Sequence, residues 1–200
     1  MPAKEGPNVL FIALDTLGTA HMGCYGYHRD TCPKIGRFAE RGVLFENAYP
    51  SDVPTEPSYT AMLSGQRGIT TGVVSHDPAE TIPRAAPWLP SVLSSGMTTC
   101  AVTTLYHMKE DLVRGFHYCI DPTFRPNKVT DPAWGKRGAR RADAEEINRL
   151  TVPWLRSLRG ERFFLFVHYW DPHTPYRPPA EYQNRWYKGD PADPGHHYLD

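Results

Sequence analysis

Two continuous apolar runs stand out in the hydrophobic pattern of this chain. Residues 8–14 (NVLFIAL) lie between Pro7 and Asp15, and residues 163–167 (FFLFV) come directly before His168. Apolar residues in continuous rather than alternating order are typical of strands that are buried on both faces of a parallel sheet. We therefore predict a buried strand at each place, with polar residues following its carboxyl end.

Apolar residues at helical spacing occupy much of the chain between these runs. Pro33 suits the first turn of a helix that stops at Gly42. Asp143 is the expected N-cap of a later helix, in which Pro153 predicts a kink. The other expected elements are helices over residues 57–64 and 89–95, a strand over 98–103 and an extended segment over 43–45.

This order of elements predicts the fold class and the place of a binding site. Strands that alternate with helices indicate an α/β protein, with a mostly parallel sheet covered by helices on both faces. Ligands of such sheets bind at the carboxyl ends of the strands, where Asp15 and residues 168–173 are expected. Residues 183–200 are polar and rich in Pro and Gly, and are expected to be a loop or a truncated end.

Composition excludes several classes of partner. The chain has 200 residues, 40% of them hydrophobic, which is enough for one domain with a sizeable core. Because 22 Lys and Arg balance 22 Asp and Glu, no charge excess favours a nucleic acid, and the basic residues 136–141 are interpreted as a solvated turn. No apolar run approaches the roughly 18 residues that cross a membrane, so no membrane partner is expected.

The N-terminus and the cysteines bear on the cellular compartment. Residues 1–6 lead into the first strand without the apolar segment of a secretory signal, so a cytoplasmic protein is expected. The cysteines have neither disulfide density nor a zinc-binding spacing, and we expect free thiols at Cys24, Cys32, Cys100 and Cys119.

Three residues could carry chemistry, and each also has a structural interpretation. Asp15 can cap a helix or, at a strand end, bind a divalent cation. Thr55 precedes the helix expected at 57–64, where its hydroxyl can cap backbone N–H groups or act as a nucleophile beside an oxyanion. His173 can be a structural loop residue or can donate a proton to a substrate oxygen.

A further group of polar residues follows the strand expected over 98–103. Tyr106, His107 and Lys109 hold the same position after that strand that His173 holds after residues 163–167. A contact of this group with substrate is therefore a second expectation.

Three segments together resemble the sulfatase family of the alkaline phosphatase superfamily. The similarity covers about residues 7–182 and is loosest between 70 and 140. The order and spacing of the segments make it specific. They are Pro7–Leu17 with His21–Gly26, Pro33–Tyr49, and Phe163–Tyr176.

The resemblance implies an alkaline-phosphatase-like α/β sandwich with a metal ion beside the nucleophile. Asp15 matches the family's first metal-binding acid, and Thr16 stands where many members carry a second aspartate. Thr55 aligns with the Cys or Ser that sulfatases convert to formylglycine, and Tyr59 replaces the arginine of that motif. Ca²⁺ is the ion implied by sulfatases, with Mn²⁺ or Zn²⁺ as alternatives.

Threonine at position 55 changes the expected chemistry. Formylglycine arises from Cys or Ser, so a threonine is not expected to yield that aldehyde. A Thr55 alkoxide resembles instead the nucleophile of superfamily phosphodiesterases and phosphotransferases. The predicted function is therefore a metal-dependent hydrolase of sulfate, phosphate or phosphonate esters of small molecules.

The resemblance also implies metal ligands that this sequence does not contain. Family members supply an Asp followed by His or Asn from a strand beyond the part matched here. The chain is therefore expected to be the N-terminal part of a single sulfatase-like catalytic domain. The alternative is a sulfatase-like module that binds an anion or a partner without catalysis. The sequence does not indicate the oligomeric state.

Overall fold

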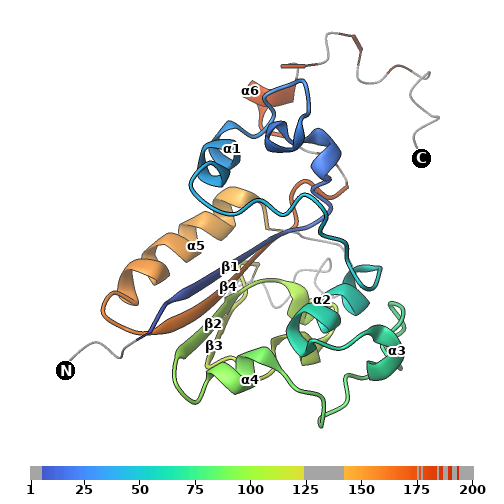
Figure 1. Cartoon of the computed structure of the whole chain (residues 1–200), viewed down its shortest axis with the longest axis vertical. Coiled ribbons are helices and arrows are strands. Elements are labelled where there is room, and N and C mark those ends of the chain that lie inside the picture. Colours follow the sequence, from blue (N-terminus) through green and yellow to red (C-terminus); the bar gives the residue numbers. More distant parts are fainter. Residues whose placement is uncertain are drawn as a thin grey trace, which may run out of the picture.

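Four parallel strands form one sheet in the order β1-β4-β2-β3 (Figure 1). The computed structural model describes residues 6–123, 142–174, 176, 178–183, 185–186, 189–190 and 193. The basic residues 136–141 and most of residues 183–200 lie outside these ranges, so their expected conformations stay predictions. The strands are β1 (Val9–Leu14), β2 (Thr98–Val102), β3 (Tyr118–Ile120) and β4 (Phe163–Tyr169).

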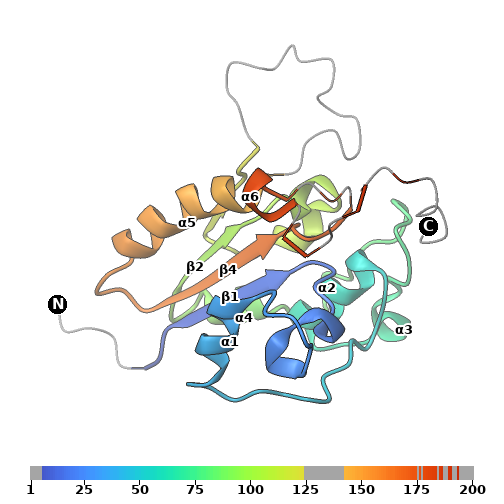
Figure 2. The same cartoon turned by 90° about the horizontal axis from the view of Figure 1, so that it is seen from above.

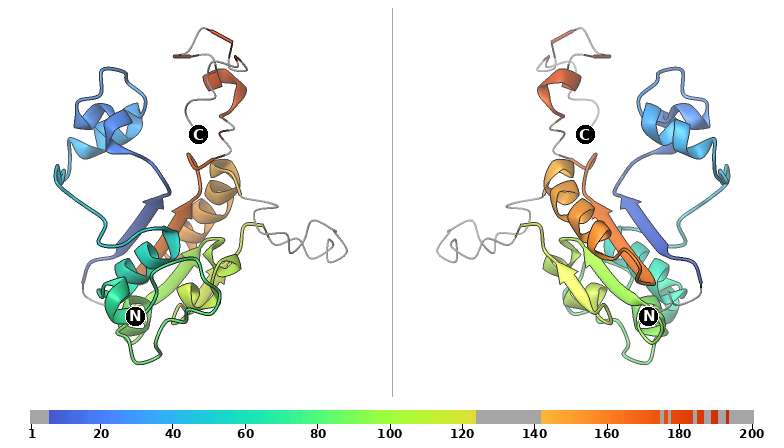
Figure 3. Two further views of the ribbon diagram at one scale, coloured as in Figure 1. Left: turned by 90° about the vertical axis from the view of Figure 1, so that its right-hand side faces the viewer. Right: turned by 90° about the vertical axis from the view of Figure 1, so that its left-hand side faces the viewer.

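Helices cover both faces of this sheet, as the sequence predicts. One core lies under α5 and contains Ile147, Leu165 and Val167, whereas the other lies under α2 and contains Tyr59 and Phe166. Two views show α5 on one side and α2 to α4 on the other (Figures 1 and 3). The α-helices are α1 (Pro33–Ala39), α2 (Thr55–Ser64), α3 (Gly68–Thr71), α4 (Leu89–Leu93), α5 (Ala144–Ser157) and α6 (Ala180–Gln183), and the 3₁₀ helices are η1 (Thr19–His21), η2 (Gly23–Tyr25), η3 (Leu105–His107) and η4 (Glu110–Val113).

The predicted elements agree only in part with those observed. The Asp143 carboxylate accepts from the Glu146 N–H at 2.8 Å, which confirms the N-cap of α5, and the helix continues through Pro153. Helix α4 ends at Leu93, earlier than predicted, and the hydroxyls of Ser94 and Ser95 after it donate to backbone carbonyls three residues back. Residues 43–45 form no strand.

The prediction that residues 8–14 are buried on both faces is wrong. Strand β1 lies at the edge of the sheet, where Leu10 is 44% exposed and Ile12 is 54% exposed. Phe11 and Ala13 point to the other side and pack against the core under α2. A continuous apolar run predicts two covered faces, but α5 packs mainly over β4 and β2.

The structure tests the expectation for the cysteines. All four cysteines are free, which confirms the prediction. Within the described ranges, none of the helices has the length and apolar character needed to cross a membrane.

Candidate active site

Strands β1, β2 and β4 run in the same direction, so their carboxyl ends lie at the same edge of the sheet (Figure 2). Strand β4 extends two residues beyond its predicted end, and the carbonyl of Tyr169 accepts from the Asp15 N–H at 2.9 Å. The parallel register thus places Asp15 beside the start of the loop that carries His173. Asp15 and the residues that follow β4 thus lie at the same edge of the sheet, as the sequence predicts, and binding at this edge stays a prediction.

A buried histidine lies opposite Asp15 at this edge. His168 is fully buried at the end of β4, and its Nε2 is 3.9 Å from Oδ2 of Asp15. Its Nδ1 is 3.2 Å from the hydroxyl oxygen of Thr103, which also accepts from the Leu105 N–H at 3.0 Å. The sequence analysis did not single out His168 as a site residue, although a polar residue directly after FFLFV was the available signal.

Tyr59 extends from α2 into the same cluster. Its ring meets the ring of His168 edge-on at 5.2 Å, and its side chain is buried. Burial raises the pKa of the Tyr59 phenol, and the negative charge of Asp15 raises this pKa further. The phenol therefore keeps its proton at neutral pH and is a neutral hydrogen-bond donor where the family motif carries a cationic arginine.

A row of rings connects His173 to this cluster. The Trp170 ring is 4.8 Å from the His168 ring and 5.6 Å from the His173 ring. Trp170 is itself held by a hydrogen bond from its indole N–H to the hydroxyl of Thr104. The imidazole of His173 is therefore fixed near the sheet edge through Trp170, and its Nδ1 lies 2.7 Å from the carbonyl oxygen of Thr174.

Thr55 is the first residue of α2 and does not cap it. Helix α2 begins two residues earlier than predicted, and the residue at its N-cap is Pro54. The Thr55 side chain is half-buried, and its hydroxyl makes no hydrogen bond among the described residues. The Thr55 hydroxyl thus does not cap the helix. It is available at a helix N-terminus, which favours anions.

Thr16 has an unusual backbone conformation. Its φ is +58°, in the left-handed region that β-branched residues rarely adopt. Such conformations store local strain and cluster at functional sites. Thr16 follows Asp15 directly, so the strain lies at the candidate site.

We expect Thr16→Gly to raise the free energy of unfolding by about 1 kcal/mol. The left-handed backbone costs a β-branched residue of order 1–3 kcal/mol, whereas glycine adopts it freely and loses roughly 0.5–1 kcal/mol through its greater chain entropy. Urea unfolding measures the change. Thr70→Gly, at an exposed position of α3, is the control and should lower stability by about 0.5 kcal/mol. Equal losses at both positions would contradict strain at Thr16.

Tyr106 and His107 follow β2 and differ in their contacts with the rest of the protein. Tyr106 is exposed, and His107 is held by Asp121, with 2.7 Å between His107 Nε2 and Asp121 Oδ2. The other carboxylate oxygen of Asp121 accepts from the N–H and the hydroxyl of Thr123 at 2.8 and 2.7 Å. This arrangement fixes the orientation of the His107 ring. Its contact with substrate stays a prediction.

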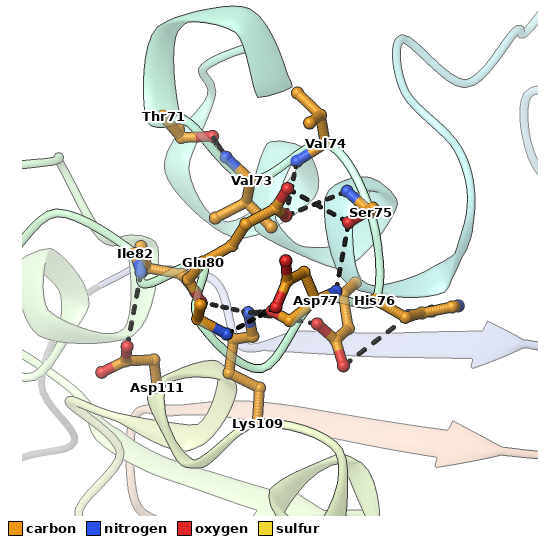
Figure 4. Close-up of polar contacts among 12 residues, drawn as sticks. Thr71, Val73, Val74, Ser75, His76, Asp77, Glu80, Ile82, Lys109 and Asp111 are labelled. Atoms are coloured by element: carbon orange, nitrogen blue, oxygen red, sulfur yellow. Dashed lines mark hydrogen bonds and ion pairs between the residues drawn. The ribbon is translucent and has the colours of Figure 1, made fainter.

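Lys109 points away from solvent, into contacts within the protein. Its ammonium nitrogen is 3.1 Å from Oε2 of Glu56, the residue that follows Thr55. It also donates to the backbone carbonyls of Asp77 and Glu80 (Figure 4). The contact of Lys109 with substrate stays a prediction, and in the structure its ammonium group has one ion pair and two hydrogen bonds within the protein.

Comparison with known proteins gives a consistent result. The family model described as Sulfatase matches residues 7–197. A Delta 4,5-hexuronate-2-O-sulfatase of Bacteroides thetaiotaomicron is 30% identical over 176 residues, which are 86% of this chain and 35% of that protein. The solved structure of a 2-O GAG sulfatase is similar with a TM-score of 0.61 and 29% identity, over 84% of this chain and 36% of that one.

A more distant structure agrees in fold alone. A protein of the alkaline phosphatase superfamily from Vibrio parahaemolyticus has a TM-score of 0.65 at 16% identity, over 94% of this chain and 47% of that one. The chain therefore spans about a third to a half of the length of these three proteins.

Proposed function

Because this chain belongs to the sulfatase family, we propose that it functions as part of a metal-dependent ester hydrolase in which the hydroxyl of Thr55 is the nucleophile. One observation supports the proposal: Thr55 begins α2, and Tyr59, four residues later in the same helix, contacts His168, whose Nε2 is 3.9 Å from Oδ2 of Asp15. The helix that begins at Thr55 thus packs against the residues at the carboxyl end of β4.

Two lines of support favour different central atoms of the ester. The names of the relatives, a hexuronate-2-O-sulfatase and a 2-O GAG sulfatase, favour sulfate esters. An unmodified threonine favours phosphate or phosphonate esters, because its hydroxyl can attack phosphorus without the aldehyde that sulfatases use. The proposal covers both until substrates are compared.

Each residue of the site has a proposed role. The Thr55 hydroxyl loses its proton to solvent as its oxygen attacks the sulfur or phosphorus and the bond to the leaving oxygen breaks, and a water molecule then hydrolyses the ester formed on Thr55. The N-terminal amides of α2 stabilise the negative charge on the remaining oxygens. His173 donates a proton to the leaving oxygen, while Tyr106 and His107 contact the organic part of the substrate.

Asp15 fits a metal ion, although it does not complete a site. Its Oδ2 is buried and makes no hydrogen bond among the described residues, so an acidic oxygen is available there. No group of three or more His, Cys, Asp and Glu residues gathers within the described ranges. We propose Asp15, with the hydroxyl of Thr16, as part of a divalent metal site, for which Ca²⁺ is the first choice and Mn²⁺ or Zn²⁺ the alternatives. When bound, such an ion supplies positive charge that lowers the pKa of a nearby hydroxyl.

A substrate panel tests the proposed function. An aryl sulfate, an aryl phosphate and an aryl phosphonate monoester are compared with Ca²⁺, Mn²⁺ or Zn²⁺ present and after chelation. We expect hydrolysis of at least one ester, lost on chelation, and the preferred ester distinguishes sulfur from phosphorus. A folded protein inactive on all three contradicts the proposal and favours the alternative module that binds anions without turnover.

A further inference from the structure

An ion pair connects the residue after Thr55 to the segment that follows β2. Glu56 Oε2 and Lys109 Nζ are 3.1 Å apart, and the two side chains are only 6% and 8% exposed. A buried charge is costly unless an opposite charge and hydrogen bonds compensate it. The charge of each residue therefore compensates the buried charge of the other.

The remaining donors of Lys109 bind a third segment. The ammonium group has three N–H donors, and two of them reach the backbone carbonyls of Asp77 and Glu80. Figure 4 shows Lys109 beneath the loop that carries these carbonyls. Glu56 also meets this loop, because its Oε1 is 3.6 Å from Nδ1 of His76. The pair thus joins α2, the loop and the segment after β2.

The loop above the pair is folded by its own contacts. The Glu80 carboxylate accepts from the N–H groups of Val74 and Ser75 at 2.9 and 3.0 Å and from the Ser75 hydroxyl at 3.1 Å (Figure 4). These hydrogen bonds, the Ser75 N–H first, lower the pKa of Glu80. The carbonyls that Lys109 meets therefore belong to a turn with a defined shape.

Lys109 is also anchored on its backbone side. Its N–H donates to the carbonyl of Leu105 at 3.1 Å, and its carbonyl accepts from the Leu112 N–H at 3.1 Å. Both leucines are fully buried in the core under α2. Lys109 therefore links the fixed end of β2 to the first turn of α2.

From this geometry we propose that Lys109 is a positioning residue that acts through Glu56 to hold Thr55 at the start of α2. This inference rests on the proposed function of Thr55. The pair fixes the first turn of α2 from the side, where no capping side chain holds it, since the N-cap is Pro54. Lys109 acts here without touching substrate, because its side chain is 8% exposed and its ammonium group is paired with Glu56 and hydrogen-bonded to two backbone carbonyls within the protein.

Lys109→Met in the full chain tests the proposal with two readouts. Amide hydrogen exchange in a peptide covering α2 should become about tenfold faster, because the first turn loses its lateral contact. The kcat of the ester preferred in the substrate panel should fall by about 10²-fold with little change in KM, because a displaced nucleophile slows chemistry more than binding.

Arg114→Met is the matched control. The Arg114 guanidinium donates to the carbonyls of Ile82 and Pro83 at 3.2 and 3.0 Å and lies over the Trp88 ring. It thus anchors the end of the same loop to the segment after η4 without a contact to Glu56. Its replacement should change neither the exchange of α2 nor kcat.

A second variant keeps the test decisive if Lys109→Met does not fold. Glu56→Gln with Lys109→Gln removes both charges and leaves two neutral amides, and the same two readouts apply to it. Unchanged exchange in α2 would overturn the proposal, and so would faster exchange without a loss of kcat. The exchange measurement needs no turnover, so a failure of the ion pair to hold α2 is distinguishable from a failure of Thr55 as nucleophile.

Discussion

Replacement of Thr55 by alanine is expected to lower kcat/KM for the preferred ester by at least about 10³-fold. The proposed reaction forms a bond to the Thr55 oxygen, and alanine has no atom that can replace it. Stability should change by less than about 0.5 kcal/mol, because the side chain is half-buried and its hydroxyl makes no hydrogen bond among the described residues. Turnover and urea unfolding measure the two effects.

Two further substitutions separate the hydroxyl from the shape of the side chain. Thr55→Val keeps the branched shape without the hydroxyl and should be as inactive as Thr55→Ala. Thr55→Ser keeps the hydroxyl and should retain turnover within about tenfold. An unchanged rate in Thr55→Ala would eliminate Thr55 as the nucleophile.

Phe166→Ala should lower the free energy of unfolding by about 3–5 kcal/mol, the range for aromatic residues of protein cores. Phe166 is 1% exposed in the middle of β4. Its ring centroid lies 5.6 Å from that of Phe11 and 6.2 Å from those of Tyr59 and Phe116. Alanine would leave a cavity between the sheet and α2, and urea unfolding measures the loss.

Phe38→Ala is the control for this effect. Phe38 lies in the last turn of α1 and is 77% exposed, so its truncation should change stability by less than about 0.5 kcal/mol. A similar loss in both variants would contradict the assignment of the core to the α2 side of the sheet.

The sequence was sufficient for the parts of the fold that depend on local pattern. The apolar runs predict strands β1 and β4, and the capping pattern predicts Asp143 as the N-cap of α5. The register of parallel strands predicts that Asp15 lies near the loop after β4. These features need only neighbours in sequence or the general geometry of parallel sheets.

Features that depend on distant packing were not accessible. The exposure of β1 depends on which strands α5 covers, and this is not encoded in the apolar run itself. The partner of Lys109 is Glu56, more than fifty positions away, so an exposed substrate contact was the natural expectation for a lysine after a strand. His168 follows the predicted strand as one polar residue among several, and only the position of Asp15, 3.9 Å from its Nε2, singles it out.

The pairing of β1 with β4 has a consequence for synthesis of the chain. In the described sheet β1 has one neighbour, and the Asn8 side chain meets the Phe163 N–H across 155 positions. At roughly 5–20 residues per second, a ribosome needs about 8–30 s to make the intervening chain. The nascent VLFIAL segment therefore waits without its partner strand for that time, and a slow codon between the two strands lengthens the wait.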